Sequence, residues 1–170
     1  MNNKAIANFV YRIRAARNRM ATANSTVVRV GWVDGSKTHK GKDGSDTGFT
    51  LASIAKVMCY GRAEMSNART HRRIPAIPSR NFVEVMKKKY MKPIASEMRK
   101  EILDIENVKE EIDYRRIGVT AKGQMQRAVK DSNEYAPNAP STVRRKGSAR
   151  PLIDTGILLN SVDFEIVKEK

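Results

Sequence analysis

The chain has 170 residues, and 33 lysines and arginines against 18 aspartates and glutamates give it a formal net charge of +15. This length fits one domain with extensions. No apolar run reaches the roughly 20 residues of a membrane span, and residues 1–20 lack the apolar core of a signal peptide. The single cysteine, Cys59, excludes an intramolecular disulfide and fits a reducing cytoplasm. The charge predicts nucleic acid, an anionic surface or acidic protein as a partner.

The first 24 residues predict a basic amphipathic helix. Apolar side chains recur there at helical spacing, at Ile6, Phe9, Val10, Ile13 and Ala16. The same segment carries five basic groups and no acidic one. We therefore interpret residues 1–24 as an N-terminal helix or arm, and residues 25–170 as a single domain with extended loops.

Two segments far apart in the chain have the character of strands. Residues 27–33 are rich in β-branched side chains, and residues 162–167 alternate between apolar and polar side chains. The remaining segments read as helices or loops, which leaves these two strands to pair with each other. The predicted fold class is α+β, with a small, mostly antiparallel sheet from strands near 27–33 and 162–167 packed by helices.

Four helices are predicted between the strands, over residues 50–58, 80–104, 111–131 and 152–160. The N-cap candidates of the first two are Thr50 or Thr47 and Asn81 or Ser79. The first helix should end at Gly61. Pro93 lies inside the second, so we expect that helix to kink or split near Met91.

The later two helices are less regular. The inward-facing candidates of the helix at 111–131 are Ile112, Ile117, Val119, Ala121, Met125, Ala128 and Val129. Gly118 leaves the first half of that helix uncertain, because glycine is a poor helix former. The short helix at 152–160 is predicted to be capped by Asp154 or Thr155.

The connections between these elements are long. Residues 34–48 contain four glycines and almost no apolar side chain, which predicts a mobile loop or a hairpin tip. In the connector at 62–80, Pro75 and Pro78 exclude a helix and predict extended chain. Residues 132–151 contain three prolines and no apolar periodicity. That loop is longer than compact domains usually keep without a functional reason.

No catalytic or metal-binding constellation is apparent. Residues 154–156 (DTG) match the aspartic-protease signature, but the motif occurs once and only 14 residues follow it, so a helix cap is the better interpretation. His39, His71 and Cys59 have no partners at metal-ligand spacing, and no phosphate-binding loop is present. We predict a protein that is not an enzyme and carries no cofactor.

The basic residues gather in four clusters, at 12–19, 69–73, 87–92 and 144–150. Aromatic side chains that could stack on bases are not interleaved with them, so contact with phosphates or with acidic proteins is favoured over base readout. The candidate contacts to DNA or to an acidic partner are Arg12, Arg14, Arg17, Arg19, Arg72, Arg73, Lys87, Lys88 and Lys89.

Residues 101–113 reverse the charge. The candidates for contacts between subunits in this acidic block are Glu106, Glu110, Glu111 and Asp113. One acidic block together with several basic clusters suits head-to-tail contacts between copies of the chain. Protein contact and nucleic-acid contact both stay open at this point.

Two motifs in the C-terminal half resemble those of a known family. Residues 74–82 (IPAIPSRNF) look like the Ile-Pro-x-Arg-Pro-Phe segment of tailed-phage neck and tail-completion proteins, with Ile77 where arginine is usual and Arg80 close by. Residues 136–148 (APNAPSTVRRKGS) and 150–156 (RPLIDTG) are similar to the long C-terminal motif of that family. The resemblance covers a little over half of the chain.

The resemblance implies a structural virion component that is assembled in the host bacterial cytoplasm and completes the tail and joins it to the head. It implies a homo-oligomeric ring at the neck, with six or twelve copies as candidate stoichiometries, and no membrane. The expected neighbours are head-completion or adaptor proteins, tail-terminator, sheath or tube proteins, and packaged DNA. The implied partner-binding residues of the loop arm are Pro137, Asn138, Pro140, Arg144, Arg145, Lys146 and Arg150. The alternative is a basic, non-enzymatic nucleic-acid-binding protein.

Overall fold

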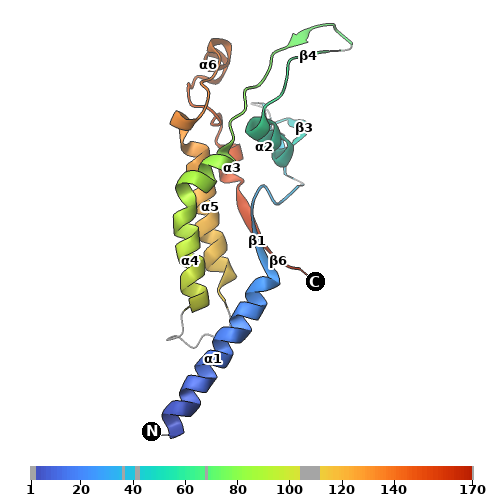
Figure 1. Ribbon diagram of the computed structural model, residues 1–170. Coiled ribbons are helices and arrows are strands. Elements are labelled where there is room, and N and C mark those ends of the chain that lie inside the picture. The colour runs from blue at the N-terminus through green and yellow to red at the C-terminus, as the bar shows by residue number, and fades with distance from the viewer. Residues whose placement is uncertain (1–2, 36, 41–42, 68, 104–111, 170) are drawn as a thin grey trace.

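The computed structural model describes residues 3–35, 37–40, 43–67, 69–103 and 112–169, and it confirms an α+β fold (Figure 1). The elements in chain order are α1 (Asn3–Asn24), β1 (Thr26–Gly31), β2 (Thr38–Lys40), β3 (Asp46–Thr50), α2 (Leu51–Tyr60), β4 (Met65–Ser66), β5 (Arg73–Ile74), α3 (Phe82–Val85), the π-helical turn η1 (Met86–Tyr90), α4 (Met91–Leu103), α5 (Tyr114–Lys130), the 3₁₀ turn η2 (Ser132–Glu134), α6 (Pro140–Lys146), α7 (Ile157–Asn160) and β6 (Asp163–Lys168).

The two predicted strands pair with each other. Strands β1 and β6 are antiparallel, with a register that runs from Thr26 opposite Lys168 to Gly31 opposite Asp163. Both strands begin and end within two residues of the predicted bounds. β-Branched side chains fit a pleated, half-buried surface, which explains why this pairing could be expected from local sequence.

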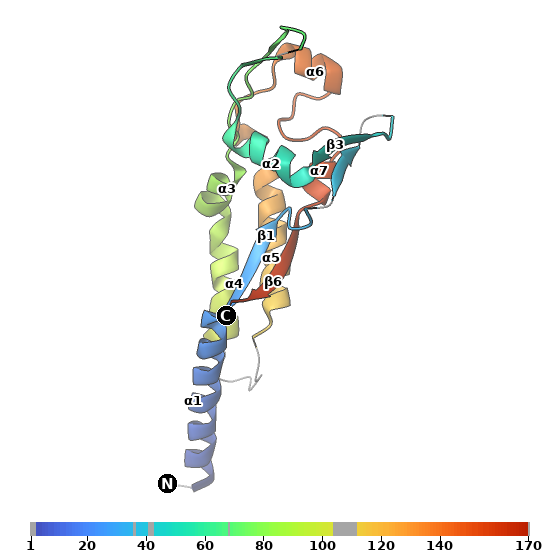
Figure 2. The ribbon, with the colours of Figure 1, turned by 90° about the vertical axis from the view of Figure 1, so that its right-hand side faces the viewer.

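Helix α5 packs against α4 and against both strands of this sheet (Figures 1 and 2). Its buried side is formed by Ile117, Gly118, Ala121, Gln124, Met125, Ala128 and Val129. The prediction that Val119 faces inward is wrong. Val119 lies off this stripe of the helix and is 57% exposed. At Gly118 the helix approaches the sheet so closely that an added Cβ would lie 2.2 Å from Cδ2 of Phe164.

The segment from α3 to α4 changes helix type before its proline. Of the two predicted candidates, Asn81 is the N-cap, and its Oδ1 accepts from the backbone N–H of Glu84. The π-helical turn η1 follows, and α4 starts at Met91. Pro93 has no N–H to donate to the carbonyl four residues earlier, and its ring crowds that carbonyl, so the split near Met91 is confirmed with a physical reason.

Both predicted loops contain regular structure. Residues 34–48 include β2 and most of β3, which form a hairpin closed by Thr38 Oγ1 donating to Asp46 Oδ2 at 2.7 Å. The prediction of loop throughout 132–151 is wrong, because η2 and α6 lie inside it. Helix α6 has Pro140 in its first turn and the left-handed Gly147 at its end, and this Pro-then-Gly pattern is a known helix signature.

The predicted helix at 152–160 is shorter than expected. Only α7 is helical, and its N-cap residue is Gly156 in the left-handed conformation, in place of Asp154 or Thr155. Leu152 also has a positive φ of 62°. These backbone conformations turn the chain back toward β6 and prevent an earlier helix start.

Helix α1 extends away from the rest of the chain and is linked to it by contacts with β1 and α4 (Figures 1 and 2). Its side chains Phe9, Tyr11 and Ile13 are exposed. Over the residues that the structure describes, no helix combines the length and the apolar character that a membrane crossing requires.

Candidate partner-binding cleft

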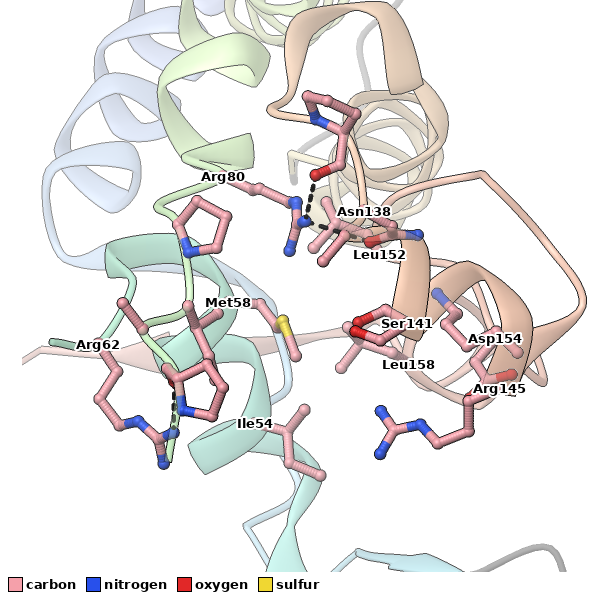
Figure 3. Close-up of a pocket in the computed structure, with 18 of the residues that line it drawn as sticks. Ile54, Met58, Arg62, Arg80, Asn138, Ser141, Arg145, Leu152, Asp154 and Leu158 are labelled. Carbon is pink, nitrogen blue, oxygen red and sulfur yellow. Dashed lines mark hydrogen bonds between the residues drawn. The ribbon is translucent and has the colours of Figure 1, made fainter. Parts of the chain in front are cut away.

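Two segments that lie about 60 residues apart in the sequence form the walls of a cleft of about 870 Å³ (Figure 3). We call residues 74–80 the strap and residues 136–156 the arm. The floor is formed by Ile54 and Met58 of α2 and by Leu158 of α7. The strap and the arm are the segments that carry the two sequence motifs.

Helix α2 holds the strap in place. Its N-cap is Thr50, one of the two predicted candidates, and its C-cap is Gly61, as predicted. The next residue, Arg62, exchanges two backbone hydrogen bonds with Ile77, at 2.9 and 2.8 Å. Ser79 adds a side-chain bond from its Oγ to the carbonyl of Cys59 at 2.7 Å. The prolines of the strap keep it extended between these anchor points.

Arg80 joins the strap to the arm. Its side chain is only 6% exposed. Its Nε donates to the carbonyl of Ala136 at 3.0 Å, and one terminal nitrogen donates to Asn138 Oδ1 at 3.1 Å. The Asn138 amide in turn donates to the carbonyl of Arg150 at 3.1 Å, which closes the arm on itself. The sequence indicated Arg80 only as a displaced motif arginine.

The positively charged guanidinium of Arg80 donates its hydrogen bonds to neutral oxygens. Its acceptors are two backbone carbonyls and one amide oxygen, and among the residues that the structure describes no carboxylate lies within 4.0 Å of it. Burial lowers the pKa of Arg80, but an arginine starts from such a high value that it stays charged. The cleft therefore contains a buried positive charge.

The rest of the lining is apolar with a basic edge. The basic lining residues are Arg62, Arg80, Arg145 and Lys146, against a single acid, Asp154. Burial lowers the pKa of Lys146, whose Nζ donates to the carbonyl of Arg150 at 3.3 Å. The apolar lining includes Ile54, Met58, Ile74, Pro75, Ile77, Leu152, Ile157 and Leu158, and no Phe, Tyr or Trp belongs to the lining. Such a surface fits apolar side chains that accompany a negative charge.

The structure gathers most of the predicted arm residues at this cleft. Those that line it are Pro137, Asn138, Pro140, Arg145 and Lys146. Arg144 and Arg150 are exposed outside the lining, and Arg150 contributes only its backbone. The bonds from Arg80 and helix α6 give the arm a defined conformation within the chain.

The predicted basic contacts do not form one patch. Arg19 is only 3% exposed, so its prediction as a surface contact is wrong: its side chain packs inside the fold. Lys89 forms ion pairs within the chain with Asp131 and Glu134. Lys88 Nζ lies 3.4 Å from Glu84 Oε1, and Arg73 Nε lies 3.8 Å from Glu64 Oε1. The exposed positions that remain are Arg14, Arg17, Arg72 and Lys87, with Arg12 half-buried.

Most of the acidic block lies outside the described residues, including Glu106, Glu110 and Glu111. Asp113 is described and has a role within the chain. It is the N-cap of α5, where its Oδ1 accepts from the backbone N–H of Arg116 at 3.0 Å. This role was not indicated by the acidic character of the block.

The other candidate side chains do not form a reactive site. Cys59 is buried, its thiol donates to Asn81 Oδ1 at 3.3 Å, and burial raises its pKa. His39 is half-buried at the cleft and His71 is exposed. Within the described part of the chain, no group of three or more His, Cys, Asp or Glu side chains is arranged to hold a metal ion.

Comparison with models of protein families, with curated protein sequences and with solved structures finds no significant match for this chain.

Proposed function

We propose that the chain is a structural protein of a tailed-phage virion, which forms a homo-oligomeric ring at the neck, completes the tail and joins it to the head. The observation that carries this proposal is the cleft. The strap and the arm, which hold the residues similar to the neck-protein motifs, meet there and are joined by Arg80. Two motifs that lie far apart in the sequence and build one surface in the fold are expected to serve one binding function.

The arm is suited to docking against another protein. The bonds from Arg80 and Asn138, together with helix α6, fix its conformation before any partner arrives. A preordered segment loses less conformational entropy when it binds. The proposed partners are the head-completion or adaptor protein on one side of the ring and the tail-terminator, sheath or tube proteins on the other.

The proposal is tested with particles made by a phage that encodes the protein with Arg145→Glu and Lys146→Glu. We expect heads and tails to accumulate unjoined in electron micrographs, because two positive charges at the cleft become negative. The matched control is Lys56→Glu with Lys92→Glu, which reverses two exposed charges outside the cleft lining. Normally joined particles with a protein from which residues 137–148 are deleted would refute the role of the arm.

The alternative, a basic nucleic-acid-binding protein, rests on the exposed arginines Arg14 and Arg17 of α1. Phosphate contacts of this kind weaken steeply as salt increases. Under this alternative, Arg14→Glu with Arg17→Glu abolishes a salt-sensitive shift of duplex DNA, and particles assemble normally without the protein. No shift at low salt would exclude it.

A further inference from the structure

Helix α1 carries a stripe of apolar side chains that the described part of the chain leaves exposed. Phe9 is 64% exposed, Ile13 52% and Met20 47%, and Ala16 between them is half-buried. Only the C-terminal part of the helix lies beside the rest of the chain, where it contacts β1 and α4 (Figures 1 and 2). Because helices in proteins are stabilised mainly by the packing of an apolar face, the exposed stripe is suited to bind a partner.

The spacing of the stripe is that of a coiled coil. The four side chains follow one another at intervals of four, three and four residues, which places one on each turn along a single line of the helix. In a heptad, Ile13 and Met20 are then the a positions, and Phe9 and Ala16 are the d positions. A strict a and d stripe is narrower than the apolar face of a helix that packs on a broad surface, so this seam fits one facing helix.

Arginines border the seam. Arg12 and Arg17 occupy the g and e positions on its two sides, and residues 1–24 contain no acidic side chain. The remaining charged flanking position, Arg19, is only 3% exposed and lies on the side of α1 that packs against the chain. In a parallel pair of two α1 helices, Arg12 of one copy faces Arg17 of the other, and an antiparallel pair sets g against g and e against e. Like charges therefore disfavour a second copy as the occupant in either orientation.

We propose that the seam of α1 binds an amphipathic helix of another protein, one with apolar side chains at heptad spacing and acidic side chains beside them. The apolar side chains of that helix cover Phe9, Ile13 and Met20, and its carboxylates pair with Arg12 and Arg17. Duplex DNA uses the arginines but leaves the apolar stripe in water, so a helix satisfies more of this surface. The inference does not depend on the proposed function, because α1 lies outside the strap and the arm.

The test uses the purified full-length chain and labelled synthetic peptides, whose binding is followed by fluorescence anisotropy. The matching peptide has leucine at a and d and glutamate at e and g. A second peptide has lysine at e and g, and a third has the composition of the first in scrambled order. We expect the matching peptide to bind at least about tenfold more tightly than either of the others. The scrambled peptide controls for the general attraction of acidic peptides to a chain with a net charge of +15.

A seam variant tests the apolar part of the contact. Phe9→Gln with Ile13→Gln keeps good helix formers but removes half of the seam. Both side chains are exposed, so the fold of the rest of the chain should be unaffected, and circular dichroism with the fluorescence of Trp32 checks this. We expect the affinity for the matching peptide to fall at least about tenfold.

A charge variant tests the borders of the seam. Arg12→Glu with Arg17→Glu should reverse the preference, so that the lysine peptide binds more tightly than the matching peptide. The matched control is Arg14→Glu with Lys56→Glu, which changes the net charge by the same amount at exposed positions away from the seam. This control should keep the preference of the wild-type chain.

Equal affinities for the matching and the scrambled peptide, or an unchanged affinity in the seam variant, would overturn the inference. Self-association of the wild-type chain in light scattering that the seam variant loses would also overturn it, because the occupant would then be a second copy. Binding to vesicles of anionic phosphatidylglycerol that the seam variant loses, without a preference for the matching peptide, would assign the seam to a membrane surface instead. Each of these results leaves the proposed neck role to the particle experiment, which does not alter α1.

Discussion

Gly61 offers the most direct test of how the strap is held. Its φ of 77° and ψ of −178° lie in a region that only glycine occupies readily, and forcing another residue there costs about 1–3 kcal/mol. A Cβ at this position would lie 2.7 Å from the Ile77 carbonyl oxygen and 2.8 Å from the Ser79 backbone nitrogen. Overpacking of this kind adds about 1–3 kcal/mol.

Backbone atoms make this clash hard to relieve. The strap is tied to α2 by the Arg62–Ile77 bridge and by the hydrogen bond from Arg80 N–H to the Met58 carbonyl at 3.0 Å. We therefore expect Gly61→Ala to lower the free energy of unfolding by about 2–6 kcal/mol, a large part of the about 5–15 kcal/mol typical of a domain. The melting temperature should fall by about 5–20 °C.

Urea unfolding followed by circular dichroism and by the fluorescence of Trp32 measures this change. Trp32 is a suitable reporter because it packs edge-on against the buried Phe82, with ring centroids 5.3 Å apart. The control is Gly123→Ala in α5, where a Cβ meets nothing within 4 Å and helix propensity should raise stability by about 0.5–1 kcal/mol. Equal effects of the two substitutions would refute the reasoning.

Three further outcomes are expected. Gly118→Ala should cost about 1–2 kcal/mol, because the clash with Phe164 outweighs the gain in helix propensity, and most of this loss should vanish in a Phe164→Leu background. The Cys59 thiol, buried and with a raised pKa, should react with iodoacetamide at pH 8 far more slowly in the folded chain than in urea; equal rates would contradict its burial. Tyr135 donates to the Ala128 carbonyl, and burial raises its pKa, so it stabilises the folded state below the unfolded pKa of about 10 and this stability is lost as pH rises above that value. Tyr135→Phe should lower stability at pH 7 by about 1 kcal/mol and flatten its decline at high pH; an unchanged alkaline decline would show that another group causes it.

Local sequence determined the elements whose signals lie within a few residues. The N-caps Thr50 and Asn81 are each one of the two candidates that the sequence offers, the C-cap Gly61 is the predicted one, and the break near Met91 is one of the two outcomes expected from Pro93. Helix α6 lies in a segment whose three prolines predict a loop, although Pro140 suits a first helical turn.

The pairing of β1 with β6 also followed from the sequence, because only two segments had strand character. In contrast, the charge pattern did not predict which basic residues are available. Arg19 is buried and Lys89 is paired within the chain, and both outcomes depend on residues distant in the sequence.

The sequence alone therefore determined the fold class, the approximate bounds of α1, β1, α2, α5 and β6, and the two motifs. Only the tertiary structure placed the motifs opposite each other. Arg80 of the strap donates to the carbonyl of Ala136, which lies 56 positions later in the chain. Caps and periodicity act over one or two turns and are visible in a short window of sequence. A cleft depends on contacts between segments that meet only after the chain has folded, so no local pattern encodes it.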